Sequence, residues 1–244
     1  MAHKFKPSYT SSIAEDIMAE RLIRAKAVEF LTEEPMRLKS GLISPVYVDN
    51  RKLFYYPEAW SDVIETMASR VEEFDLSFDI VAGVEAAGSM HAAALAYRLR
   101  LPAIMVRREA KTYGNRSRIE GGCVKGKNVL LLEDHISTGL SCLDAIRGLR
   151  DEGATVTQVM SITNFGIPET VKLFAEDGLT TFEVIAFNKV VNKAREMGNI
   201  TPEEEKLVLE WLKTPWTWAT DFRGLYAAQA VGDGLFPAVF FFCV

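Results

Sequence analysis

VLLLEDHISTGLSCLDA occupies residues 129–145. Its apolar run leads directly into Glu133 and Asp134, and a cluster of hydroxyl residues and glycine follows before a helical pattern begins. A short, continuous apolar run is typical of a buried strand. We therefore interpret this segment as a strand ending at the two acids, a turn reading ISTGLS, and a helix over about 139–151.

The turn has the composition of an anion-binding site. Backbone N–H groups at a helix N-terminus lack partners inside the helix and, with the helix dipole, attract an anion. Small residues allow close approach of the backbone, and the hydroxyls of Ser137, Thr138 and Ser141 add donors. The chain lacks the GxxxxGK[ST] pattern here, so the turn predicts a monophosphate site rather than a triphosphate loop.

The two acids point to a different part of a ligand. The neighbouring carboxylates of Glu133 and Asp134 repel each other unless a cation or hydrogen-bond donors lie between them. A pair of ribose hydroxyls meets that need, and a phosphate beside a diol describes a ribose 5-phosphate. A plain structural interpretation, in which the turn only caps the helix and the acids face solvent, has about equal weight on this segment alone.

The rest of the chain predicts an α/β fold. Short apolar runs at 79–83, 103–107, 128–133, 155–163 and 181–187 alternate with helical patterns at 88–99, 139–151 and 168–177. Strands separated by helices of crossover length imply a mostly parallel central sheet with helices on both faces. Ligands of such sheets bind beyond the carboxyl ends of the strands.

Both ends of the chain add helices to this core. Segments 12–31 and 57–74 precede it and segments 189–197 and 202–213 follow it, with Thr201 as the expected N-cap of the last helix. We see no linker or repeat, so the chain is interpreted as one domain with an accessory layer made from both ends.

Composition limits the class of protein. The chain has 244 residues, 48% hydrophobic and 25% charged, as in ordinary soluble globular proteins. A net charge of −5 gives no general attraction to nucleic acid. Three widely spaced cysteines predict neither a zinc site nor a disulfide framework, and favour a cytoplasmic location. The apolar segment 234–244 is too short to span a membrane, and we expect it to pack on the body or on a partner subunit.

Several segments together resemble the orotate phosphoribosyltransferases of the type I phosphoribosyltransferase family. The strand, acid pair and Thr-Gly turn resemble the phosphoribosyl-pyrophosphate signature of the superfamily. LKSGLISPVYVDNR (38–51), the pyrophosphate and catalytic loops within 82–122, SITNFGIPE (161–169) and MGNITPEEEKLVLEWLKTP (197–215) resemble the orotate branch. The resemblance covers roughly residues 20 to 222.

The resemblance implies transfer of ribose 5-phosphate from phosphoribosyl pyrophosphate to orotate, which gives orotidine 5′-monophosphate and pyrophosphate in pyrimidine (UMP) biosynthesis. It implies Mg²⁺ carried by the pyrophosphate, and a homodimer in which each catalytic loop closes over the other subunit's site. It also implies a hood (approximately 1–56 with 189–222) beside a core (approximately 57–188), which leaves an atypical tail at 223–244. Neither nucleic acid nor membrane is an expected partner.

Residue roles follow from the matched motifs. Catalytic roles fall on Lys111, Asp134 and Glu133. Ribose and phosphate would be held by Glu133, Asp134, Ser137, Thr138, Gly139, Leu140 and Ser141. Lys39 and Tyr47 would meet the base, and Arg107, Arg108, Lys111 and Tyr113 the pyrophosphate. The loop RREAKTYGNRSR also carries Arg116 and Arg118 against Glu109, and this basic excess favours an anionic partner and a mobile lid.

Four residues depart from the family pattern. Tyr113 stands where the catalytic loop usually has histidine, and Glu85 adds negative charge to the pyrophosphate loop. Leu140 replaces a common glycine, which would strain a position that needs positive φ. His135 replaces an apolar residue beside the acids. Two alternatives therefore remain: a phosphoribosyltransferase for another nucleobase, and a non-catalytic regulator that binds phosphoribosyl pyrophosphate.

Overall fold

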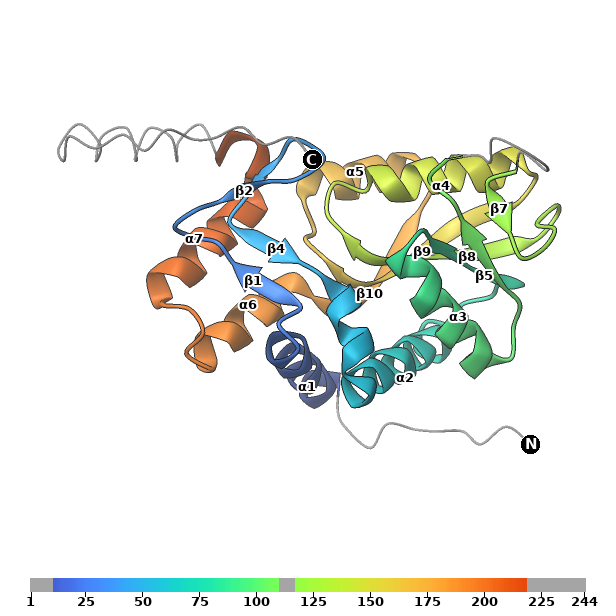
Figure 1. The fold of residues 1–244 in the computed structure, drawn as a ribbon. Helices are drawn as coiled ribbons and strands as arrows, with labels where there is room; N and C mark the ends of the chain where they lie inside the picture. The colour runs from blue at the N-terminus through green and yellow to red at the C-terminus, as the bar shows by residue number, and fades with distance from the viewer. Residues whose placement is uncertain (1–10, 110–116, 219–244) are drawn as a thin grey trace.

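The computed structural model describes residues 11–109 and 117–218, and a six-stranded sheet forms its centre (Figure 1). The order is β10-β9-β8-β5-β6-β7. The strands are β5 (Ile80–Val84), β6 (Ala103–Val106), β7 (Ile119–Glu120), β8 (Asn128–Ile136), β9 (Thr155–Asn164) and β10 (Thr180–Ala186). All neighbours pair in parallel except β7, which is antiparallel to β6. The expected mostly parallel α/β sheet is confirmed.

Helices cover both faces of this sheet. On one face lie α2 (Pro57–Glu73) and α3 (Ala87–Leu99), and on the other α4 (Leu140–Asp151) and α5 (Pro168–Glu176) (Figure 1). Because side chains alternate along a strand, Leu130 and Leu132 of β8 join the core on the α2–α3 side, while Leu131 joins the core beneath α4 and α5. Burial on both faces explains why β8 reads as an uninterrupted apolar run.

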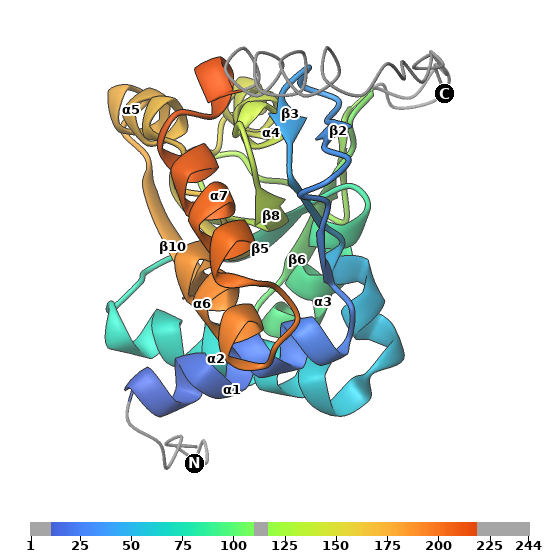
Figure 2. The same cartoon turned by 90° about the vertical axis from the view of Figure 1, so that its left-hand side faces the viewer.

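Smaller elements lie to one side of the sheet, which faces the viewer in Figure 2. They comprise α1 (Ser11–Arg24), β1 (Val28–Phe30), β2 (Met36–Arg37), β3 (Ile43–Ser44), β4 (Val46–Val48), the 3₁₀ helix η1 (Asn50–Tyr55), α6 (Phe187–Glu196) and α7 (Pro202–Lys213). β1 pairs with β4, and β2 pairs with β3, both antiparallel. Trp211 of α7 is fully buried and donates its indole N–H to the carbonyl of Ile43, which joins the two ends of the chain.

Two expectations need correction. The helix expected over 12–31 ends at Arg24, because Lys26 takes a left-handed backbone (φ 53°) and Val28–Phe30 instead pairs with β4. The strand expected to end at Glu133 continues to Ile136, because Glu133 pairs with Ser161 and His135 with Thr163 on β9. The two acids therefore lie within the last residues of β8, not after the end of the strand.

The remaining expected helices are present with small shifts at their ends. Thr201 is the N-cap of α7, as expected: its hydroxyl accepts from the N–H of Glu204, and the Glu204 carboxylate accepts from the N–H of Thr201. The segment 234–244 lies outside the described residues. Within the described residues, no helix combines the length and the apolar character needed to cross a bilayer.

Candidate active site at the carboxyl edge of the sheet

Glu133 and Asp134 lie at the carboxyl end of β8, where the start of α3 comes close. Glu133 is buried, with 8% of its surface exposed, and its Oε1 accepts from the N–H of Asp134 at 3.2 Å. Gly88 of α3 is required here, since a Cβ on it would lie 2.6 Å from the Leu132 carbonyl oxygen and 3.3 Å from Glu133 Oε1. The absence of a side chain at Gly88 therefore brings the helix against the acid pair.

Burial makes the charges of these two acids costly. Burial raises the pKa of Glu133 well above its usual value, and the neighbouring Asp134 carboxylate raises it further. Burial also raises the pKa of Asp134. The hydrogen bond with Glu133 and the nearby Arg51 lower this pKa, but only in part. The expectation that the acids simply face solvent is wrong for Glu133. Hydrogen-bond donors or positive charge placed beside such a pair stabilise its charged form.

The turn after β8 is open at the start of α4. Gly139 is the residue before the helix, with φ 74°, and no side chain caps the helix there. A Cβ at Gly139 would lie 2.5 Å from the Phe174 ring, so the left-handed backbone and the close packing both require glycine. The hydroxyl oxygen of Ser137 is buried and has no hydrogen-bond partner among the described residues. The interpretation that this turn merely caps its helix is therefore wrong.

Leu140 does not strain this turn. It is the first residue of α4 and is not among the described residues with positive φ, so the concern about a missing second glycine does not apply. Its side chain is 57% exposed and lines a pocket beside the turn.

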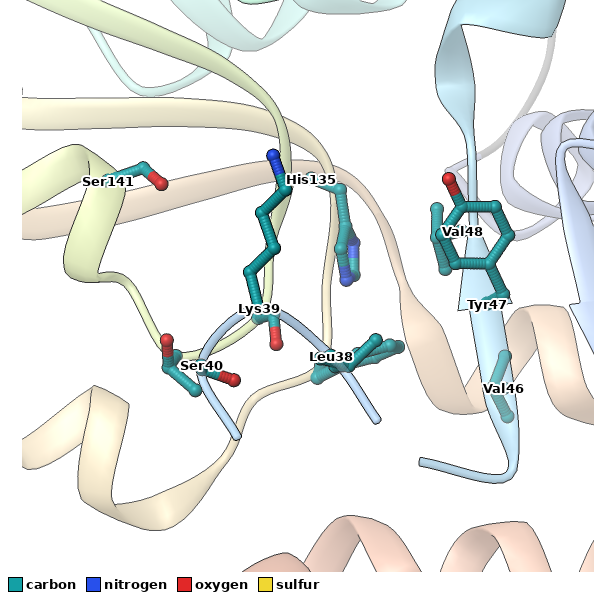
Figure 3. Close-up of a pocket in the computed structure, with 11 residues that line it drawn as sticks. Leu38, Lys39, Ser40, Val46, Tyr47, Val48, His135 and Ser141 are labelled. Carbon is teal, nitrogen blue, oxygen red and sulfur yellow. The ribbon is translucent and has the colours of Figure 1, made fainter. Parts of the chain in front are cut away.

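A pocket of about 180 Å³ gathers residues from three separate parts of the chain (Figure 3). Lys39 comes from the turn between β2 and β3, Tyr47 from β4, and Ser137, Thr138 and Ser141 from the turn after β8. In Figure 3 the Lys39 side chain extends between Ser141 and His135, and Tyr47 lies beyond His135 on β4. Five of the residues expected at the site thus surround one cavity.

One wall of this pocket is aromatic and was not singled out from the sequence. Phe165 is 5% exposed, lines the pocket, and packs edge-on against His135 with ring centroids 4.2 Å apart. It also packs against Trp211 at 5.0 Å. Phe165 directly follows β9, the neighbour of β8, so its position at the same sheet edge is a signal that could have identified it.

A second pocket of about 300 Å³ carries the basic residues. Lys39 and Ser141 line this pocket as well as the first, so the two are adjacent. Arg107 and Arg108, which follow β6, line it together with Arg118. Arg107 forms an ion pair with Glu120 at 3.0 Å, and Arg118 forms two hydrogen bonds to the Asp144 carboxylate of α4. Glu133 and Asp134 are not among the residues lining either pocket.

Glu85 forms hydrogen bonds with Arg108. Its carboxylate accepts from the N–H of Arg108 at 3.2 Å, and the Arg108 guanidinium donates to the Glu85 carbonyl at 3.1 Å. The Glu85 carboxylate is therefore hydrogen-bonded to the backbone of Arg108. Lys111, Tyr113 and Arg116 lie outside the described residues.

Comparisons with known proteins agree on one family. Residues 52–191 match the family described as the phosphoribosyl transferase domain. An orotate phosphoribosyltransferase of Coxiella burnetii is 40% identical over 201 residues, covering 82% of this chain and 96% of that protein. One of Bacillus subtilis is 34% identical over 205 residues, covering 84% and 95%.

Solved structures give the same result. The orotate phosphoribosyltransferase of Aeropyrum pernix aligns with a TM-score of 0.64 at 30% identity, over 75% of this chain and 99% of that one. The UMP synthase of Leishmania donovani aligns with a TM-score of 0.72 at 29% identity, over 82% of this chain and 42% of that one. Sequence, fold and the arrangement of the sheet edge therefore place this chain in the orotate phosphoribosyltransferase family.

Proposed function

We propose that the sheet-edge site catalyses transfer of ribose 5-phosphate from phosphoribosyl pyrophosphate to N1 of orotate, giving orotidine 5′-monophosphate and pyrophosphate. This is a step of pyrimidine biosynthesis. The observation that carries the proposal is the pocket in which the turn after β8, the β2–β3 turn and β4 meet. These segments belong to two separate motifs of the family, the 38–51 segment and the turn after the acid pair.

The turn 137–141 is the proposed site of the 5-phosphate. The start of α4 has no side-chain cap and no acidic residue in its first turn, so its N–H groups and dipole are available to an anion. The unpartnered Ser137 hydroxyl and the exposed Ser141 supply further donors beside them.

Glu133 and Asp134 are the proposed partners of the ribose. Departure of pyrophosphate before the new bond is complete gives the sugar oxocarbenium character. Fixed carboxylates beside it stabilise the developing positive charge. Because burial and mutual repulsion disfavour the charged pair, a positive charge on the ribose relieves an existing penalty.

Cations would stabilise the leaving group. Arg107, Arg108 and the loop residue Lys111 are the proposed contacts of the pyrophosphate, with Tyr113 as a hydrogen-bond donor. Among the described residues there is no cluster of three His, Cys, Asp or Glu side chains suited to a metal. We propose that Mg²⁺ is bound through the pyrophosphate oxygens, ribose hydroxyls and water, where it would neutralise charge on the leaving group.

The orotate ring is proposed to lie against Tyr47, with Lys39 close to its carboxylate. Tyr47 is half-buried, and its hydroxyl accepts from the Arg51 guanidinium at 3.4 Å, which restrains the ring. We further propose that residues 1–56 and 189–222 act as the hood over the base, and that residues 57–188 act as the core.

A homodimer with a shared catalytic loop completes the proposal. Large apolar residues are exposed around η1 and α3, among them Tyr55 at 86% and Tyr97 at 75%, which suits a contact surface. We expect a mixture of Lys111→Ala and Asp134→Asn proteins, each nearly inactive, to regain activity after subunit exchange. Absence of any recovery in a mixed dimer verified by mass would refute the shared loop.

The direct test is the spectrophotometric loss of orotate in the presence of phosphoribosyl pyrophosphate and Mg²⁺. Turnover with orotate, and much less with adenine, hypoxanthine or xanthine, is expected. Omission of Mg²⁺ should abolish it. A protein that binds phosphoribosyl pyrophosphate by calorimetry but consumes no orotate would be a binding protein instead, and would overturn the catalytic proposal.

A further inference from the structure

His135 stands out because it departs from the family pattern and lines the same pocket as Lys39 and Tyr47 (Figure 3). Its Nδ1 lies 2.9 Å from the Thr163 hydroxyl. Its Nε2 is buried and has no hydrogen-bond partner among the described residues. Buried polar atoms without partners are uncommon, because leaving one unpaired is unfavourable.

The imidazole is fixed from behind by a buried polar network. The Asn50 amide nitrogen donates to the carbonyl of Asp134 at 2.7 Å and to the Thr163 hydroxyl at 3.1 Å. Because a carbonyl can only accept, the orientation of this amide is settled. Asn50 and Thr163 are both fully buried, and Phe165 packs edge-on against the ring. The His135 ring is therefore held in a fixed orientation, with its Nε2 left unpartnered.

The ring is neutral under physiological conditions. Burial lowers the pKa of His135 to about 3, and contact with the Thr163 backbone opposes this only in part. A neutral imidazole has little attraction for a phosphate. It does offer one hydrogen bond at Nε2, as a donor when the Thr163 hydroxyl gives its hydrogen to Nδ1, and as an acceptor when Nδ1 keeps its proton.

The pocket around the ring has an aromatic and aliphatic lining. Its walls include the aromatic side chains of Tyr47 and Phe165 and the aliphatic side chains of Leu38, Val46 and Val48. Ser141 of the phosphate turn lies on the other side of Lys39 from His135 in Figure 3. His135 thus belongs to the part of the pocket that suits a base.

We propose that His135 is a specificity residue, whose Nε2 hydrogen-bonds to a polar edge atom of the pyrimidine once side chains of the pocket wall have shifted to expose it. This rests on the proposed function. Leu38, which lines the pocket, belongs to the β2–β3 turn that also carries Lys39.

The kinetic test compares His135→Leu and His135→Gln with the parent protein. Loss of one neutral hydrogen bond should raise the KM for orotate roughly 3- to 10-fold, with the KM for phosphoribosyl pyrophosphate unchanged. Glutamine, whose amide reaches about as far as Nε2, should recover part of the loss. Equal KM values for orotate in the leucine variant and the parent would overturn the proposal. Absence of orotate turnover in the parent would instead refute the proposed function.

His91 supplies a matched control. It is fully buried, its Nδ1 accepts from the Trp60 indole at 3.0 Å, and burial lowers its pKa to about 4. It lines neither of the two pockets. His91→Gln should therefore reduce stability without changing the KM for orotate.

A second readout uses the parent protein and does not depend on folding of a variant. The chain has only three histidines, His3, His91 and His135, so their imidazole NMR signals are few. Addition of orotate and pyrophosphate should shift the His135 signal and leave that of His91 in place. A bound complex in which the His135 signal does not move would overturn the proposal.

Discussion

Two helix starts in this protein look alike in sequence and differ in the structure. Thr138 and Gly139 precede α4, and Thr201 precedes α7. Thr201 has an extended backbone and closes its helix by a reciprocal pair of hydrogen bonds with Glu204. Gly139 has a left-handed backbone, and no side chain closes α4. A hydroxyl residue before a helix is therefore a cap in one place and a candidate ligand donor in the other.

The surroundings of the two helix starts reinforce this difference. The first turn of α7 contains Glu203, Glu204 and Glu205, which offset the helix dipole from within, and Glu204 also accepts from Thr32. The first turn of α4 contains no acid. The positive end of its dipole remains available to a ligand. Side chains of the protein cap the start of α7 but not the start of α4. An uncapped helix start without acidic residues is what we expect of an anion-binding site.

The largest effect should come from the acids beside α4. Asp134→Asn removes a carboxylate that is proposed to stabilise the developing charge, and should lower kcat/KM by roughly 10²- to 10³-fold. Steady-state kinetics with both substrates varied will measure this. Asp151→Asn, at the opposite end of α4, is the control and should leave kcat/KM within about twofold. Near-normal turnover of the Asp134 variant would remove the acids from the mechanism.

The same acids should make stability depend on pH. The folded-state pKa of Glu133 is raised above its unfolded value, so between these two values the folded protein holds the extra proton. Stability must then fall as pH rises through that window. Glu133→Gln should flatten the decline and raise the melting temperature at alkaline pH. A scan of melting temperature against pH for both proteins decides it, and parallel curves would contradict the assignment.

Closing the open turn with a methyl group should damage both folding and binding. Gly139→Ala meets positive φ and the Phe174 ring together, and should cost about 2 to 3 kcal/mol while weakening phosphoribosyl pyrophosphate binding. Gly178 is the matched control, because its φ is 71° and nothing lies within 4 Å of an added Cβ. Gly178→Ala should cost about 1 kcal/mol. Equal losses in urea unfolding would show that Phe174 packing is unimportant.

Removing a single hydroxyl at the α4 start should affect binding alone. Ser141→Ala deletes one donor that lines both pockets, and should raise the KM for phosphoribosyl pyrophosphate about 3- to 10-fold. The melting temperature should stay within about 1 °C, since surface substitutions rarely change stability by more than about 0.5 kcal/mol. Loss of stability without a change in KM would make this helix start resemble that of α7.

The smallest kinetic effect should be found at α7. Thr201→Ala removes the cap and should cost about 1 kcal/mol, or roughly 2 to 4 °C in melting temperature, with unchanged kinetic constants. Thr201→Ser, which keeps the hydroxyl, should restore the stability. A change in the KM for either substrate in the alanine variant would show that the two helix starts are coupled.

Much of the fold could be predicted because its signals are local. The central strands β5, β8 and β9 are mostly buried on both faces and contain apolar runs, and the Thr201 cap has its glutamate three residues later. Errors arose where pairing decided the outcome. The helix expected to continue to 31 ends at Arg24 because Val28–Phe30 finds a partner in β4, and β8 carries the acids onward because β9 extends beside it.

The candidate site also has features that could be predicted from the sequence and features that could not. The residues of the β8 turn could be recognised from the sequence because they are contiguous, and Lys39 and Tyr47 from their own motif. The contacts that orient them join residues far apart in the chain: Asn50 holds Asp134 and Thr163, and Phe165 packs against His135. No periodicity or spacing in the sequence predicts these contacts, because they form only when the strands lie side by side.

By itself the sequence determined the alternation of strands and helices, the family motifs and the presence of an acid pair before a hydroxyl turn. Only the tertiary structure decided that the α4 start has no side-chain cap, that Glu133 is buried, and that His135 lines the pocket with a buried, unpartnered Nε2. The physical reason is that periodicity and capping depend on neighbours a few residues away. Burial, pKa and pocket shape depend on every segment packed around a group.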